Sequence, residues 1–144
     1  MIHEDTIKLL RECDAGIKMG VSAIDDVLDY VKNDSFKNIL TKCKEKHEKL
    51  ATDLEELLKE YGDNGKEPNP LASTMSKIKT NVKLSCDTSD ETSADLITDG
   101  CNMGVKSLNK YLNKYVAAEE KVKSIAKKLI DLEENLAKDI RRFL

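Results

Sequence analysis

The chain has 144 residues, of which 35% are charged and 4% are aromatic, with no tryptophan and a formal net charge of -3. A chain of this length can bury one hydrophobic core without disulfides or metal ions as supports. Many charged and few aromatic residues favour long helices over a β-sandwich or barrel. Because the two signs of charge are interspersed, the sequence shows no basic patch of the kind that binds nucleic acid or an anionic membrane.

The sequence predicts a cytoplasmic protein. It has no apolar run of the roughly 20 residues that span a bilayer. The first residues, MIHEDTIK, lack the basic and apolar regions of a signal peptide. No cysteine lies in a C-x-x-C motif and the set lacks zinc spacing, so a structural zinc site is not indicated. We expect buried, reduced thiols instead. The four cysteines are Cys13, Cys43, Cys86 and Cys101.

Apolar residues at alternating steps of three and four predict helices over about 5–32 and 36–61. Gly16 and Gly20 lie on or beside the apolar stripe of the first helix, which predicts close approach by the backbone of a neighbouring helix. Asp34 or Ser35 is the expected N-cap of the second helix, and Gly62 is its expected stop. The stripe of the first helix comprises Leu10, Cys13, Ile17, Gly20, Ile24, Val27 and Val31.

The stretch 62–70, GDNGKEPNP, predicts a linker. Asn69 and Pro70 then suit the N-cap and first residue of a short helix over about 71–84. Thr88 and Glu91 have the spacing of a capping box before a third long helix. The two remaining long helices are expected over about 90–115 and 118–143.

A pattern of Cys-x-x-Gly-aliphatic-Lys occurs twice, at Cys13–Lys18 and at Cys101–Lys106. Each copy lies in the first helix of a predicted pair, which indicates an internal repeat of two related helical hairpins. The long connection between the pairs can cross the length of the bundle, as in ferritin-like folds. We therefore predict a single all-α domain over 1–144, a ferritin-like four-helix bundle whose crossover holds the short helix.

The chain resembles a bacterial ferritin-like four-helix-bundle family classed as a domain of unknown function. The resemblance covers nearly the whole chain and implies the bundle fold. It also raises the question of a di-iron site. The features that carry it are the two Cys-x-x-Gly motifs, the second helix with His47, the linker after Tyr61 and the short helix that follows.

The residues of a ferritin-type di-iron centre can be counted in the sequence. Such a centre uses a Glu on each of two helices and a Glu-x-x-His on each of the other two. Only His3 and His47 are present, and Lys44 stands where the Glu before His47 would be. The helix over 118–143 has no histidine. A complete di-iron centre is therefore not predicted. A degenerate iron or manganese site near His47 stays open as an alternative.

Several further side chains bear on that alternative. Glu133 and Glu134 have no histidine at the required spacing, and the other candidate carboxylates are Glu12, Asp95 and Asp99. His47 lies on the apolar stripe, so we interpret it as a neutral core histidine that is hydrogen-bonded to a neighbour, with a ligand or acid–base role as the alternative. Tyr111 and Tyr115 are expected to be core residues whose hydroxyls reach the end of the bundle.

No nucleophile elbow, phosphate loop or dinucleotide fingerprint occurs in the sequence, which favours a non-catalytic protein. The main hypothesis is a bundle that acts through contacts with protein partners or as a homo-oligomer, in a structural or stress-related role. Apolar residues off the stripes suggest a second contact surface, namely Met19, Val21, Leu28 and Leu112. A thiol redox role for Cys13 and Cys101, at equivalent depths in the bundle, is a third hypothesis.

Overall fold

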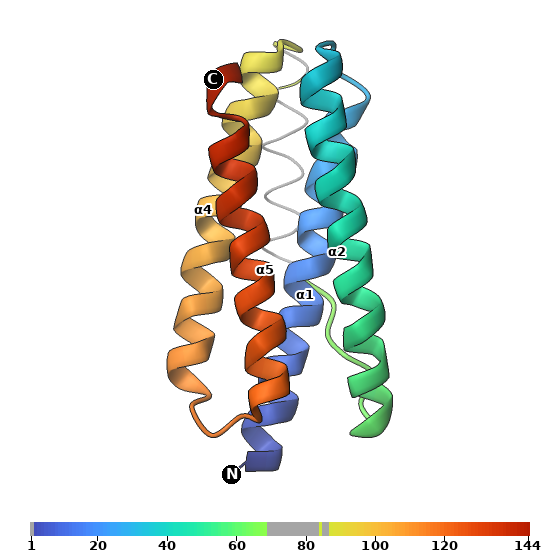
Figure 1. Ribbon diagram of the computed structural model, residues 1–144, viewed down its shortest axis with the longest axis vertical. Helices are drawn as coiled ribbons and strands as arrows, with labels where there is room; N and C mark the ends of the chain where they lie inside the picture. Colours follow the sequence, from blue (N-terminus) through green and yellow to red (C-terminus); the bar gives the residue numbers. More distant parts are fainter. Residues whose placement is uncertain (1, 69–83, 85–86) are drawn as a thin grey trace.

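The computed structural model describes residues 2–68, 84 and 87–144. These residues form helices and loops and include no strand, which confirms the predicted all-α four-helix bundle (Figure 1). The elements are α1 (Ile2–Leu28), α2 (Asp34–Glu60), α4 (Asp90–Lys114), α5 (Glu120–Asp139) and a final 3₁₀ turn, η1 (Arg141–Phe143).

The helices form two antiparallel hairpins, α1–α2 and α4–α5, that pack side by side. Figure 1 shows that α2 ends at one end of the bundle and that α4 begins at the other. The connection between them therefore crosses the length of the bundle, as predicted. Across the hairpins, α1 packs against α4 and α2 packs against α5, while α1 also contacts α5.

The helix ends differ from the predicted ones by a few residues. Asn33 is the N-cap of α2, since its side chain accepts a hydrogen bond from the Phe36 amide at 3.0 Å. The expected caps Asp34 and Ser35 instead lie inside the helix. The helix α1 extends over Ile2–Leu28 instead of 5–32, and the predicted helix over 118–143 is divided into α5 and η1.

The predicted capping box of Thr88 and Glu91 is wrong, because the N-cap of α4 is Ser89. Its hydroxyl accepts a hydrogen bond from the Thr92 amide at 3.2 Å. Asp87 sets this turn, since its carboxylate accepts hydrogen bonds from the Ser89 amide at 2.9 Å and from the Thr92 hydroxyl at 2.6 Å.

Gly62 follows the last turn of α2 with a φ of 66°, as expected of a helix stop. The predicted cap at Asn69–Pro70 lies outside the described residues. So does the short helix over 71–84, except for Leu84, which is helical and 2% exposed.

Apolar side chains fill the space between the helices in two clusters. The first core cluster comprises Leu9, Leu10, Cys13, Ile17, Leu50, Leu54, Leu58, Leu108, Ala118, Val122, Ile125, Ala126, Leu129 and Ile130. The second core cluster comprises Ile24, Val27, Val31, Phe36, Leu40, Cys43, Leu84, Ala94, Ile97, Cys101, Leu136 and Ile140. The predicted stripe of α1 is buried in these clusters except at Gly20, which is half-buried.

Residues 61–68, here called the strap, turn back from the end of α2 and run along α1 (Figure 1). Asp63 in the strap accepts a hydrogen bond from Arg11 at 2.6 Å, and the Lys66 amide donates to Asp14 at 2.9 Å. Gly65 has a φ of 80° and faces Asp14 so closely that a Cβ would overlap the carboxylate. The strap is therefore fixed on α1 by backbone as well as side-chain contacts.

Each hairpin loop is hydrogen-bonded by the start of the other hairpin. At one end of the bundle, the carboxylate of Asp90 in α4 accepts from the amides of Lys32 at 2.8 Å and Asn33 at 2.9 Å. At the other end, Asp5 accepts from the Ala117 amide at 3.1 Å, and the Thr6 hydroxyl accepts from the Glu119 amide at 2.9 Å. The two ends therefore use the same kind of contact.

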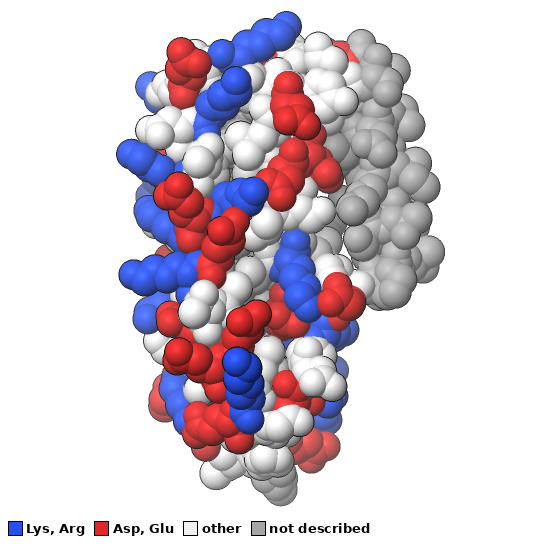
Figure 2. Space-filling model, turned by 90° about the vertical axis from the view of Figure 1, so that its right-hand side faces the viewer, with Lys and Arg blue, Asp and Glu red and all other residues white. Residues whose placement is uncertain are grey.

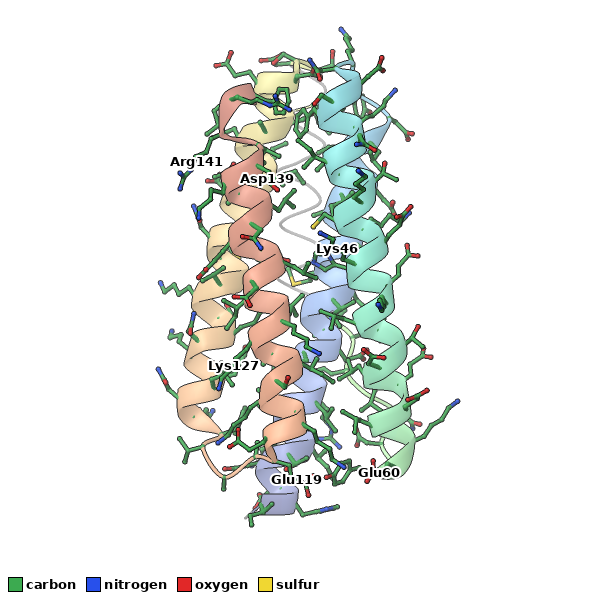
Figure 3. The ribbon with its side chains drawn as sticks, viewed as in Figure 1. Lys46, Glu60, Glu119, Lys127, Asp139 and Arg141 are labelled. Atoms are coloured by element: carbon green, nitrogen blue, oxygen red, sulfur yellow. The ribbon has the colours of Figure 1, made fainter. Side chains whose placement is uncertain are left out.

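Charged side chains cover the outside of the bundle. On the face shown in Figure 2, lysine and arginine side chains are interspersed with aspartate and glutamate over the part of the chain that the structure describes. Arg141 and Glu60 point away from the core (Figure 3). Among the described helices, none is long and apolar enough to cross a membrane.

Candidate functional site

A polar layer separates the two core clusters. It consists of one residue from each helix: Gly20 in α1, His47 in α2, Gly104 in α4 and Glu133 in α5. Along every helix the layer residue lies between members of the first and second core clusters. His47 is 0% exposed and Glu133 is 8% exposed, so the bundle buries an imidazole and a carboxyl group at this level.

Both ring nitrogens of His47 have partners inside the core. Nδ1 lies 2.8 Å from the carbonyl oxygen of Cys43, one turn earlier in α2. Because a carbonyl oxygen can only accept, Nδ1 carries a hydrogen. Nε2 lies 3.0 Å from Oε1 of Glu133, which joins α2 to α5. A second proton therefore lies between Nε2 and Oε1, since two bare acceptors would repel each other at this distance.

The surroundings of His47 favour retention of that proton. Burial lowers the pKa of the imidazole, but hydrogen bonds with Cys43 and Glu133 outweigh it and raise the pKa to about 10. The sequence predicted a neutral histidine without anticipating the buried Glu133 carboxyl group, whose contact favours the protonated imidazole. The predicted burial and hydrogen bond of His47 are both present.

Two thiols border the polar layer. Sγ of Cys43 lies 3.6 Å from Nδ1 of His47, and the Cys101 thiol is hydrogen-bonded to the Glu133 carboxylate. Burial and the charge of Glu133 both raise the pKa of Cys101. Burial also raises the pKa of Cys13 to about 12. Thiols with such raised pKa values form little thiolate near neutral pH, so they are poor nucleophiles.

Gly20 provides the space that the pair occupies. A Cβ at this position would lie 2.8 Å from Nε2 of His47 and 3.2 Å from Oε1 of Glu133. The predicted close approach of a neighbouring helix backbone is not what lies at Gly20, because the nearest atoms belong to the side chains of His47 and Glu133. Gly104 leaves more room, because a Cβ there would lie 3.6 Å from the nearest Glu133 atom. At Gly16 the nearest atom, from Leu129, is 3.4 Å away.

The other candidate carboxylates do not join the layer. The structure leaves Asp95, Asp99 and Glu134 exposed on the outside of α4 and α5. Glu12 is half-buried and forms an ion pair with Lys66 of the strap at 2.6 Å.

Tyr111 and Tyr115 stack with ring centroids 6.2 Å apart and pack, partly buried, against the first core cluster. This agrees with the predicted core role. Cys13 lies in the first core cluster and Cys101 in the second, so the two thiols lie toward opposite ends of the bundle. The cause is the antiparallel packing of α1 and α4, which places matching positions toward opposite ends.

The sequence predicts no metal-ligand role for Glu133, because α5 contains no histidine to complete a Glu-x-x-His motif. Its partner instead comes from α2, 86 residues earlier in the chain. One signal could have identified it. Glu133 lies four residues after Leu129 and three before Leu136, so it occupies the apolar stripe of its helix, as His47 does.

The layer brings together two metal-ligand types, the imidazole of His47 and the carboxylate of Glu133, but not the set of a di-iron centre. Within residues 2–68, 84 and 87–144, no group of three or more His, Cys, Asp or Glu side chains could hold a metal ion. Comparison with known proteins adds no assignment, since no family model, curated protein or solved structure matches the chain.

Proposed function

We propose that this chain is a cytoplasmic, ferritin-like helical bundle that acts through contacts with protein partners or further copies of itself, in a structural or stress-related role. It carries out no chemistry of its own. The proposal is supported above all by the polar layer, whose polar groups are hydrogen-bonded to one another inside the core. His47 uses both nitrogens within the core, and Glu133 binds His47 and Cys101.

A closed layer of this kind has little capacity for catalysis. A general base must reach the proton that it removes from a substrate. His47 is fully buried and Glu133 nearly so, and the adjacent backbone of Gly20 leaves no room beside them. The pair is therefore better explained as part of the packing of the bundle.

A groove on the outside of α1 and α2 is the proposed contact surface. It has a volume of about 340 Å³. Its lining residues are Ile17, Lys18, Val21, Ser22, Asp25, Glu48 and Ala51. Apolar side chains with charged neighbours are typical of a protein contact surface. Of the apolar residues predicted to form a second surface, Val21 lines this groove and also packs on the first core cluster. Leu112 packs on the first core cluster and Leu28 on the second.

The test is self-association measured by sedimentation over a wide concentration range. We expect concentration-dependent assembly that Ala51→Lys weakens, since a charged side chain there would enter the groove. Asn113→Lys, at an exposed position on α4, is the matched control and should leave assembly unchanged. A wild-type protein that stays monomeric at the highest accessible concentration would count against self-association.

A second candidate function is binding of iron or manganese at His47. The observation that favours it is that the polar layer brings together an imidazole nitrogen of His47 and a carboxylate oxygen of Glu133, two ligand types that iron and manganese accept. Elemental analysis of protein purified without chelators or affinity-tag metal tests it. Near-stoichiometric metal that is lost in folded His47→Ala would support this candidate, and metal content unchanged by that substitution would eliminate it.

A further inference from the structure

We infer that the buried contact between His47 and Glu133 determines which hairpins pack together. Because of it, the α1–α2 hairpin packs on the α4–α5 hairpin in preference to a second α1–α2 hairpin. This goes beyond the proposed function, because it concerns which halves of the protein may associate. The basis is the distribution of buried polar groups over the two helices that meet between the hairpins, α2 and α5.

The two facing stripes are complementary at one position only. The buried residues of α2 include one imidazole and no carboxylate: Phe36, Leu40, Cys43, His47, Leu50, Leu54 and Leu58. The buried residues of α5 include one carboxylate and no base: Val122, Ile125, Ala126, Leu129, Ile130, Glu133 and Leu136. An α2 stripe packed on another α2 stripe would bury His47 without a carboxylate. Two α5 stripes would bury two glutamates without a base.

The rest of the molecule offers little against such mispairing. Both hairpins are antiparallel, and the motif at Cys13–Lys18 recurs at Cys101–Lys106 in the helix that faces it across the bundle. The loop contacts are also alike, because Asp5 and Asp90 each accept hydrogen bonds from loop amides of the opposite hairpin. Apolar stripes of similar period can pack on one another in several combinations.

The polar layer changes the relative free energies of these combinations. A buried ionisable group that loses its partner destabilises a structure strongly, whereas two apolar replacements of similar size are often neutral or stabilising. A single buried polar contact is known to fix partner and register in helical assemblies. Here the contact is satisfied only when α2 meets α5, so the correct closure of one chain is favoured over pairing between like hairpins of two chains.

The test compares single and double replacements in the full chain. His47→Leu or Glu133→Leu alone leaves one buried polar group unpaired and should raise the unfolding equilibrium constant by about 100-fold or more. His47→Leu with Glu133→Leu should recover most of that loss. The matched control is Leu50→Met with Leu129→Met, which alters the same two helices within the first core cluster and keeps its volume.

Pairing is then read by zero-length carbodiimide cross-linking and mass spectrometry. The ion pair of Lys121 with Glu60, at 2.9 Å, joins the two hairpins, whereas that of Lys66 with Glu12, at 2.6 Å, lies within the first hairpin and its strap. In the leucine double variant we expect the intramolecular Lys121–Glu60 cross-link to fall several-fold and dimers to appear in sedimentation. The Lys66–Glu12 cross-link should persist in the leucine double variant. The methionine control should match wild type in both cross-links and oligomeric state. Any assembly through the outer groove would appear equally in that control, so it can be told apart from mispairing.

A leucine double variant that remains folded with the wild-type Lys121–Glu60 cross-link and the wild-type oligomeric state would overturn the inference. Should that variant fail to fold, His47→Met with Glu133→Met replaces it, because methionine adapts to irregular space. If neither double variant is more stable than the single variants, the inference is also overturned. The contact would then be needed for the stability of the fold itself and would not serve to choose which hairpins pair.

Discussion

The two core clusters and the polar layer between them hold the same four helices together in different ways. The clusters consist of apolar side chains that can contact one another in many combinations. The layer contains one imidazole and one carboxylate that satisfy each other in one combination only. Burial of apolar area therefore supplies most of the stability of the bundle, while a single polar contact restricts which helices can be neighbours.

The largest expected effect comes from weakening an apolar cluster. Leu54 is 0% exposed in the first core cluster. Leu54→Ala should therefore lower the free energy of unfolding by about 2 to 5 kcal/mol, measured by denaturant titration. Pairing should not change, so the Lys121–Glu60 cross-link should persist in the folded fraction. Loss of that cross-link in folded Leu54→Ala would show that the clusters also select partners.

The next prediction concerns pH and centres on His47 in the polar layer. Unfolded His47 loses its proton near 6.5, whereas folded His47 keeps it until about pH 10. The stabilisation is therefore complete below pH 6.5 and is lost as the pH rises through 10. Between about pH 7 and 9, the free energy of unfolding should fall by up to about 1.4 kcal/mol per pH unit.

Denaturant unfolding at several pH values measures this slope. The double variant His47→Leu with Glu133→Leu has no such group and should lose the slope, whereas Leu50→Met with Leu129→Met should keep it. An equal slope in the leucine double variant would assign the pH dependence to other residues.

A smaller effect is expected where the layer meets the backbone of α1. In Gly20→Ala the new Cβ would lie 2.8 Å from Nε2 of His47, so the pair must shift. We expect a loss of about 1 to 3 kcal/mol in thermal or denaturant unfolding. Gly100→Ala is the control, since a Cβ there meets nothing within 4 Å, and it should gain up to about 1 kcal/mol from helix propensity. Equal responses of the two variants would argue against crowding at Gly20.

The smallest effect separates the two glycines of the layer. A Cβ at Gly104 would lie 3.6 Å from the nearest atom of Glu133, an ordinary van der Waals contact. Gly104→Ala should therefore be neutral or stabilising by up to about 1 kcal/mol in the same assay. A clear loss of stability would mean that α4 also limits the position of the carboxylate, and the layer would then be constrained on both sides.

Much of this architecture is accessible from the sequence, because it depends on local signals. The stripe from Leu10 to Val31 and the stop at Gly62 were predicted and are present. The partner of His47 was missed, since it depends on which helices become neighbours and lies 86 residues away. The capping residues were missed by one position, because side chains outside the usual motif, such as Asp87, select among adjacent Ser, Thr and Asn candidates.

The strap has a consequence for tolerance to mutation. It covers a side of α1 that would otherwise face solvent, while α2, α4 and α5 contact the others. The residues of α1 beside the strap, from Glu12 to Lys18, are all buried or half-buried. Surface positions usually accept substitution with little effect on stability. The middle of α1 has few such positions, so in a scan of all single substitutions it should be the least permissive segment of the four helices.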